Sequence, residues 1–346
     1  MLKRLLKNLR WSVLPVPTRV LAVIFLVFLF FIPLINATNY IMLIFTFANI
    51  FVIFTVSWDL LSGYTGLVNF GHALFFGVGA YGSALLYKHL GWQPWATIPL
   101  GALAATAIGV ITCFPALKLR GPYLSLLTLA FPLMLYGIVV AIPMRIAGGS
   151  YGIYPIPALA SSPVSGYYLV LIVMIVSVLI MWKLTDAGSK YIRTGLIFHA
   201  IREDEIAARA VGIDTIRYKM LAFAIGGLFA GIAGGLYAHT QMVCAPGTLD
   251  MTMSFQVIIW AIFGGIVSIY GSVVGVYTLY PLTELLRKFS EYRTLILVII
   301  VILVLLFMPQ GIAVWIRDKI ERECPRCKLR NAAWRRECRA CSAALH

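Results

Sequence analysis

The C-terminal 23 residues contain four cysteines with the spacing of a metal site. Cys324 and Cys327 form one C-x-x-C pair, and Cys338 and Cys341 form a second pair after ten intervening residues. Two such pairs can place four thiolates around tetrahedral zinc. Two disulfides are the alternative, and they would require the tail to lie outside the cell. Because so short a segment cannot bury a useful core, bound zinc would supply most of its folding energy.

A second candidate site lies in the glycine-rich stretch SGYTGLVNFGHALFFGVGAYG, residues 62–82. Asn69, Gly71 and His72 occur there in an otherwise apolar sequence, which we expect to form a helix. Glycine lets helix backbones approach closely, and irregular backbone within a membrane must be packed in protein or face water. Two interpretations stay open. Asn69 and His72 are satisfied by neighbouring helices in a tightly packed region, or this glycine-rich helix lines a path for a solute.

The elements that must position these residues are predicted to be transmembrane helices. Of the 346 residues, 61% are hydrophobic and 12% are charged, against roughly 45–50% and about 25% in a soluble domain. We therefore expect an all-α polytopic membrane protein with about ten transmembrane helices. Nine is the alternative, because glycines interrupt the run that holds the eighth and ninth blocks. The apolar blocks cover about residues 20–36, 40–62, 66–87, 95–116, 121–141, 167–182, 220–240, 253–268, 271–286 and 293–309.

The basic surplus follows the predicted topology. The formal net charge is +15, which in a soluble protein would suggest a nucleic-acid partner. With ten spans and an internal N-terminus, the inner segments hold 23 of the 28 Lys and Arg residues, as the positive-inside rule requires. We therefore expect a multi-pass protein of the cell membrane with both termini in the cytoplasm. The predicted parts are a cytoplasmic N-terminal segment, a transmembrane domain and a cytoplasmic tail, at residues 1–19, 20–312 and 313–346.

The largest inner segment, residues 183–219, has the pattern of a docking loop. Residues 194–217 show an amphipathic helical period, in which Glu205 and Arg209 form an i,i+4 pair and Gly212 follows the last periodic position. A helix lying on the membrane surface and a helix that docks on a soluble partner are both compatible with this pattern. The apolar positions of the period are Ile197, Ile201, Ala208 and Val211.

At this loop the sequence resembles a known family. REDEIAARAVGIDTIRYKMLAFAIGGLFAGIAGGLYA, residues 202–238, is similar to the coupling loop and following span of permease subunits of branched-chain amino acid ABC importers of the LivM type. Further similar segments follow in the family's order over about residues 40–312, for example SFQVIIWAIFGGIVSIYGSVVG at 254–275. The positions that match the family's coupling loop are Glu205, Ala207, Ala208 and Gly212.

The resemblance implies a permease subunit that forms the path for a small polar solute, with branched-chain amino acids as the expected substrates. It implies pairing with an identical or related permease, two cytosolic ATPase subunits docked on the loop, and an extracytoplasmic binding protein that delivers substrate. No G-x-x-x-x-G-K-[ST] motif occurs in the chain, so ATP would act only through the partners and the chain is not expected to be an enzyme. The predicted path residues are Asn69, Gly71 and His72.

Other functions remain as alternatives. Related permeases are associated with urea or short amides, and the sequence does not choose among these solutes. The four cysteines predict a small C-terminal zinc ribbon at residues 324–341. A membrane-anchored interaction or regulatory protein that works through this ribbon is an alternative of another class. A membrane enzyme is disfavoured, because no constellation of catalytic residue types collects in the spans. The tail after residue 312 exceeds the usual family length, and its basic residues could contact anionic lipids, the ATPase or, least favoured, RNA.

Overall fold

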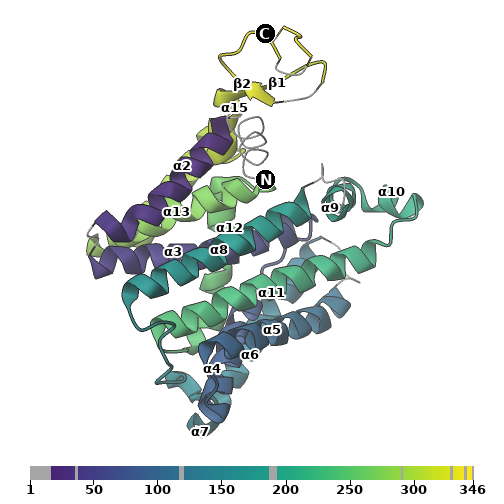
Figure 1. Cartoon of the computed structure of the whole chain (residues 1–346). Coiled ribbons are helices and arrows are strands. Elements are labelled where there is room, and N and C mark those ends of the chain that lie inside the picture. The colour runs from purple at the N-terminus through teal and green to yellow at the C-terminus, as the bar shows by residue number, and fades with distance from the viewer. Residues whose placement is uncertain are drawn as a thin grey trace, which may run out of the picture.

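The structure, a computed structural model, describes residues 17–35, 38–116, 121–186, 193–289, 291–327, 330–338 and 341–344. Helices dominate it (Figure 1). Each predicted apolar block overlaps one of them. Most of the predicted segment 1–19 lies outside the described residues. The apolar helices are α2 (Pro17–Phe31), α3 (Asn39–Trp58), α4 (Ala73–Leu90), α5 (Pro94–Ala116), α6 (Pro122–Ala141), α8 (Pro163–Thr185), α11 (Thr215–Gln241), α12 (Met251–Gly264), α13 (Ile269–Leu285) and α14 (Arg293–Phe307).

Shorter elements complete the described chain. α7 (Met144–Ala147) belongs to the loop between α6 and α8, whereas α9 (Thr194–Glu203) and α10 (Glu205–Ala210) form the loop between α8 and α11. The tail contains α15 (Ile312–Ile320) and the antiparallel strands β1 (Glu321–Glu323) and β2 (Arg330–Ala332). Figure 1 shows this tail beyond the N-terminal end of α2.

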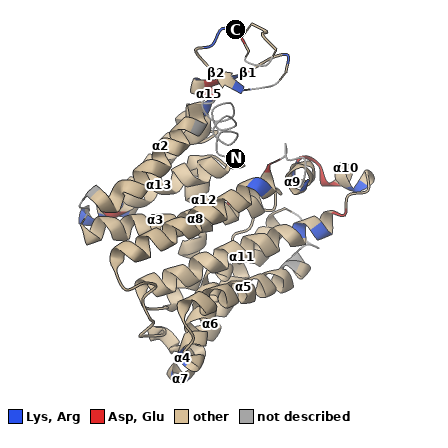
Figure 2. Cartoon of the chain, viewed as in Figure 1, with Lys and Arg blue, Asp and Glu red and all other residues tan. Residues whose placement is uncertain are grey.

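The chain is an all-α polytopic membrane protein. Among the described residues, six helical segments are long and apolar enough to cross a membrane, or seven if the pair α12 and α13, bent by 112°, counts as one broken span. Figure 2 shows these helices almost free of charged residues along their length. Ten crossings stay a prediction, because α2 is short and α4 carries Lys88 and His89 in its last turn.

Glycines set the packing of α4, α5 and α11. A Cβ atom on Gly79 would lie 2.2 Å from the carbonyl oxygen of Gly231, and one on Gly234 would lie 1.9 Å from that of Phe76. The predicted close helix packing is therefore present, since only hydrogen fits between these backbones. Aromatic side chains from α3, among them Phe51 and Phe54, fill the space beside these helices.

The helix expected from about residue 66 begins later than predicted. α3 continues into a π-helix at Asp59–Gly63, and the chain then runs without regular helix until α4 starts at Ala73. Gly66 has φ of +74°, and the Asn69 side chain accepts a hydrogen bond from the amide of Gly71 at 2.8 Å. A left-handed glycine and an Asx turn favour irregular backbone over helix here. We call residues 59–72 the polar break.

Candidate functional site

The two predicted path side chains in the polar break form one hydrogen-bonded chain. The Ser57 hydroxyl donates to the carbonyl oxygen of Phe54 at 2.7 Å, so it accepts from Nε2 of His72, which lies 2.8 Å away. With Nε2 protonated, Nδ1 of His72 is free to accept from the Asn69 amide at 3.5 Å. The His72 ring also stacks on Phe54, with 5.0 Å between ring centroids.

Side chains from two other helices hold the backbone of the break. Thr128 of α6 accepts from the amide of Phe70 at 3.2 Å, and Ser254 of α12 accepts from the amide of Ala73 at 2.9 Å. Gly71 passes so close to α6 that a Cβ atom there would lie 1.9 Å from the carbonyl oxygen of Thr128. Irregular backbone inside a membrane is stable only with such internal partners. The break is therefore positioned jointly by α3, α6 and α12.

The three predicted path residues, Asn69, Gly71 and His72, all lie at the end of the polar break. Asn69 and His72 are 1% and 0% exposed, and both have partners within the chain. In the described conformation they belong to the packed interior. A path-lining role therefore needs movement of the break, and it stays a prediction.

Sequence reasoning did not assign a role to Asp59, which ties the break to the bent helix pair. Its Oδ1 atom accepts from the amide of Val267 at 2.8 Å, directly before α13. Val267 has φ of +64°, a conformation that is uncommon for a β-branched residue. Asp59 is fully buried, and its Oδ2 atom has no partner in the described part of the chain. The position of Asp59, an acidic residue inside an apolar block, is the sequence feature that could have indicated such a role.

The predicted docking loop is two short helices rather than one. Asp204 ends α9 and caps α10, because its side chain accepts from the amides of Ile206 and Ala207 at 2.8 and 3.0 Å. Gly212 has φ of +87° and terminates α10, as predicted. After Gly212 the chain enters α11 at Thr215. Residues 187–192 of the loop lie outside the described residues.

Glu205 is the centre of an ion-pair cluster at the base of α11. Its carboxylate lies 2.5 Å from Arg209, the predicted partner, and 2.7 Å from Lys219 of α11. The Thr215 hydroxyl donates to the same oxygen at 3.2 Å. Partial burial raises the pKa of Glu205, but Lys219 and Arg209 outweigh this effect, so the pKa lies below its usual range. These contacts fix α10 rigidly to the transmembrane helix.

The apolar side chains of the docking loop differ from the prediction in which are buried and which are exposed. Ile201 and Ala208, predicted to lie on the docking ridge, are 4% exposed and pack against the chain itself. By contrast, Ile206 and Val211 are 69% and 77% exposed, and Ala207 is exposed as well. The chain changes direction at Asp204, so α10 is rotated relative to α9. The prediction treated both segments as one continuous helix and therefore placed these side chains on one face. The exposed apolar surface of α10 is therefore formed by Ile206, Ala207 and Val211.

The docking loop contacts the polar break directly. The rings of His199 in α9 and Tyr64 in the break lie 5.3 Å apart. Arg202 packs over Gly66, where a Cβ atom would lie 3.3 Å from the arginine Cγ. Burial and then Arg202 lower the pKa of His199, which favours its uncharged form beside the membrane. A displacement of α9 would therefore act on the break without an intermediate element.

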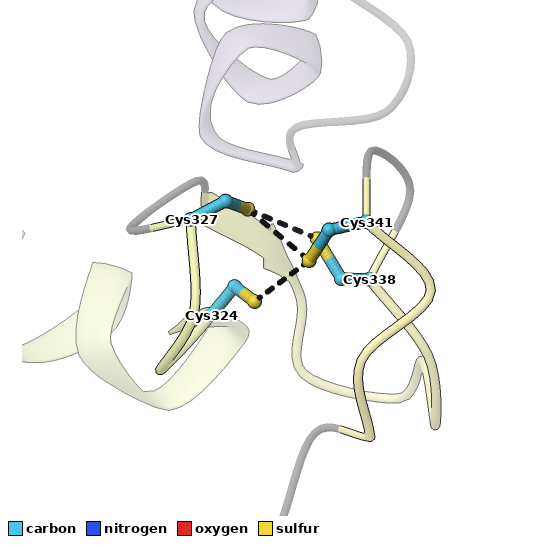
Figure 3. A group of neighbouring side chains, drawn as sticks. All are labelled: Cys324, Cys327, Cys338 and Cys341. Atoms are coloured by element: carbon cyan, nitrogen blue, oxygen red, sulfur yellow. Dashed lines mark hydrogen bonds between the residues drawn. The ribbon is translucent and has the colours of Figure 1, made fainter.

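The four cysteines of the tail converge on one point (Figure 3). Their Sγ atoms all lie within 4.8 Å of one another, and neighbouring pairs are 3.4 to 3.5 Å apart. Tetrahedral zinc with bonds of about 2.3 Å needs sulfurs about 3.8 Å apart. The observed separations are close to this value, so the four cysteines could hold a metal ion. We call residues 321–344 the cysteine module.

The cysteine module is attached to the transmembrane part at its first strand. The amide of Thr18, in the first turn of α2, donates to the Glu321 carboxylate at 3.1 Å, and Glu321 is buried. Within the module, β1 pairs with β2, and Asn331 donates to Sγ of Cys338 at 3.6 Å. The module thus has a fixed position beside the start of α2.

Comparison with known proteins agrees with the family resemblance of the sequence. A family model described as the permease component of branched-chain amino acid transport systems matches residues 40–308. The LivM permease protein of the high-affinity branched-chain amino acid transport system of Escherichia coli is 30% identical over 321 residues, which cover 83% of this chain and 72% of that protein. LivM of Salmonella typhimurium is 29% identical, and these 309 residues cover 80% of this chain and 70% of that protein.

LivH, a permease protein of the same kind of system in Salmonella typhimurium, is 26% identical over 286 residues, which cover 77% of this chain and 92% of that protein. No solved structure matches the chain. The family match covers the polar break, the docking loop and the bent helix pair, and it ends before the cysteine module. The chain belongs to the family of branched-chain amino acid transport permease components.

Proposed function

We propose that this chain is a transmembrane permease subunit of an ABC importer for branched-chain amino acids. The observation that carries the proposal is the family match over residues 40–308, which includes every helix from α3 to α14 apart from Asn39, the first residue of α3. Both LivM and LivH are named as permeases of such systems. The proposed complex therefore pairs this chain with a second permease, identical or related.

The chain needs partner subunits that hydrolyse ATP, because it has no ATP-binding motif of its own. Import against a gradient needs an energy source, and the sequence has no P-loop for ATP. We assign hydrolysis to two ATPase subunits that bind the exposed apolar surface of α10, formed by Ile206, Ala207 and Val211. An extracytoplasmic binding protein delivers the solute. The assignment places the docking loop and both termini in the cytoplasm, with ten crossings.

The contacts of α9 suggest how the ATPases drive alternating access. Glu205 and Lys219 join α10 to α11, so a pull on α10 moves the inner end of that transmembrane helix. His199 and Arg202 transmit the same motion to Tyr64 and Gly66 in the polar break. Release of the break from α6 would expose Asn69 and His72 beside Gly71 as weak polar contacts for a passing solute. Weak contacts suit a path that must also release its substrate.

The family match is the main reason for proposing branched-chain amino acids as the solute. The chemistry of the polar groups in the proposed path supports this choice. The path proposed at Asn69, Gly71 and His72 contains no Lys, Arg, Asp or Glu, and its polar groups are an amide and an imidazole, with the Ser57 hydroxyl beside them. Such groups can hydrogen-bond the two ends of a zwitterionic amino acid without holding a net charge. Urea and short amides would make similar contacts, so they are the second candidate.

Uptake measurements test the function and the coupling role together. The double variant Glu205→Lys, Gly212→Val breaks the ion-pair cluster and forces a side chain into a left-handed position. In vesicles that contain the partner subunits, we expect loss of labelled leucine uptake with normal membrane insertion. Glu203→Lys is the matched control, because Glu203 is an exposed carboxylate on α9 with no ion pair among the described residues. Normal substrate-stimulated ATPase activity in the double variant would contradict the coupling role, and uptake of urea in place of leucine would change the substrate.

For the cysteine module, we infer that the four thiolates hold zinc. Cys324, Cys327, Cys338 and Cys341 would be the ligands, and zinc would act as a structural ion without an open coordination position. The residues that remain, apart from β1 and β2, are turns and bends that bury little apolar surface. Metal analysis of the purified chain, with Cys327→Ser for comparison, tests this assignment.

A further inference from the structure

A groove lies where the cysteine module meets the start of α2. It has a volume of about 570 Å³ and is lined by Pro17, Val20, Leu21, Ile320, Trp334 and Arg335, together with Ala332. Five of these seven side chains are aliphatic, one is aromatic and one is cationic. The bond from Thr18 to Glu321 fixes the two walls of the groove relative to each other.

The apolar side of the groove continues along α2. Leu21 is 49% exposed, and Ile24 and Phe28, one and two helical turns further, are 59% and 50% exposed on the same face. Phe28 contacts the ring of Phe45 on α3, with 6.5 Å between ring centroids. The exposed part of the stripe has the composition of a lipid-facing surface. A hydrocarbon chain that enters the groove would therefore continue along α2 in contact with apolar side chains only.

The polar side of the groove carries uncompensated positive charge. Arg335 lines the groove and is exposed, and no carboxylate of the described residues pairs with it or with its neighbour Arg336. By contrast, Arg330 of the same module is paired with Glu323 at 3.1 Å. Trp334 is 73% exposed between the apolar wall and these arginines. An exposed tryptophan beside arginine at the end of an apolar helix is typical of the membrane interface.

We propose that this groove binds one anionic phospholipid of the adjoining leaflet. The acyl chain lies against Val20 and Leu21 and follows the α2 stripe, and the phosphate pairs with the guanidinium of Arg335, which can donate two parallel hydrogen bonds to it. Trp334 covers the glycerol region between them. The proposal explains why an apolar groove ends in an unpaired arginine, and it does not depend on the transported solute.

Brominated-lipid quenching tests the proposal with the full chain in nanodiscs. The difference in emission between the wild type and Trp334→Phe isolates the fluorescence of Trp334. In phosphatidylcholine discs we expect dibrominated phosphatidylglycerol to quench this component at a lower mole fraction than dibrominated phosphatidylcholine. Arg335→Ala should raise the phosphatidylglycerol fraction for half-maximal quenching by about tenfold or more, since a hydrogen bond to a charged group is lost, and Arg335→Lys should restore part of the preference.

Two controls separate a lipid site from general charge attraction and from misfolding. Arg322→Ala removes the same charge from an exposed position of β1 that does not line the groove, and should leave the preference unchanged. The visible absorption of cobalt bound at the cysteines should be equal in every variant, because the module remains folded. Equal quenching by both brominated lipids, or an equal loss with Arg322→Ala and Arg335→Ala, would overturn the proposal.

Discussion

The polar break and the cysteine module are both short stretches without regular helix, yet they are held in opposite ways. The break is fixed by hydroxyl groups of three long helices and by close backbone contact at Gly71. Under the proposed zinc assignment, the module is held by four sulfur atoms of its own 24 residues, and Thr18 of α2 bonds its Glu321 carboxylate. Stability is therefore distributed in the first region and concentrated at one point in the second.

This difference separates two kinds of function. A distributed network of modest hydrogen bonds can rearrange stepwise, because each bond contributes only about 0.5–1.5 kcal/mol. A metal-centred module is either assembled or unfolded. The break therefore suits a part that moves in each transport cycle, and the module suits a fixed attachment.

Metal removal should give the largest effect and should act on the module alone. Zinc binding supplies roughly 10–16 kcal/mol in small zinc domains, so a chelator or Cys327→Ser should unfold residues 321–344. We expect hydrogen exchange of the module to reach the unfolded limit while α3 and α11 keep their protection. Equal loss of protection in α3 would show that the two regions fold as one unit.

Gly71→Ala should give the next largest effect, confined to the break. Its Cβ atom would lie 1.9 Å from the carbonyl oxygen of Thr128, so α6 or the break must move. Overpacking of this kind costs typically 1–3 kcal/mol and occasionally more, measured as a lower unfolding temperature of the detergent-solubilised chain. Gly137→Ala on α6 is the matched control, because nothing lies within 4 Å of its added Cβ. A similar loss in both variants would point to general helix effects.

Ser57→Ala should have a smaller effect on stability and a clear effect on transport. The change leaves Nε2 of the buried His72 without its partner, at a cost of about 1–3 kcal/mol. We expect a lower unfolding temperature and altered uptake, with bound metal unchanged. Ser161→Ala, at an exposed loop position, provides the comparison. Uptake equal to that of the wild type in Ser57→Ala would contradict a role of the polar break in transport.

Glu205→Gln should change stability least, because partly exposed ion pairs contribute about 0.2–1 kcal/mol each. The lowered pKa of Glu205 gives the sign of the pH dependence. The ionised carboxylate stabilises the native state above its unfolded pKa of about 4.3, and this contribution disappears as pH falls through the lower native value. Unfolding temperatures of wild type and variant should therefore differ at pH 7 and converge in acid. A difference in unfolding temperature that stays the same at every pH would show that the effect comes from packing and not from the charge of Glu205.

Much of the architecture follows from the sequence, because apolar blocks of spanning length have few alternatives to helix. Composition and spacing predicted an apolar helix within each block, although the one expected from about residue 66 begins only at Ala73. They also predicted the Glu205 and Arg209 pair, the Gly212 terminus and the convergence of four cysteines. These features depend on neighbouring residues along the chain.

The parts that were not predicted depend on distant contacts. Hydroxyl groups of α6 satisfy backbone groups of residues 64–72, and these partners lie more than 50 residues away in the chain: Thr128 accepts from the amide of Phe70, and Ser125 donates to the carbonyl oxygen of Val68. Asp204 divides the docking loop by capping α10, which turns Ile201 and Ala208 inward and Ile206 outward. The bond from Asp59 to Val267 spans 208 residues, and no local pattern indicates it.

The π-helix at Asp59–Gly63 also has a consequence for how relatives of this chain can vary in length. Its closing bond runs from the amide of Tyr64 to the carbonyl oxygen of Asp59, five residues back, at 3.0 Å. Deletion of one residue would restore ordinary α-helix and rotate all that follows by about 100°, which would turn Tyr64 away from His199. In evolutionary terms, this turn tolerates exchange of side chains more readily than insertion or deletion, so alignments of transport-competent relatives should pass through it without gaps.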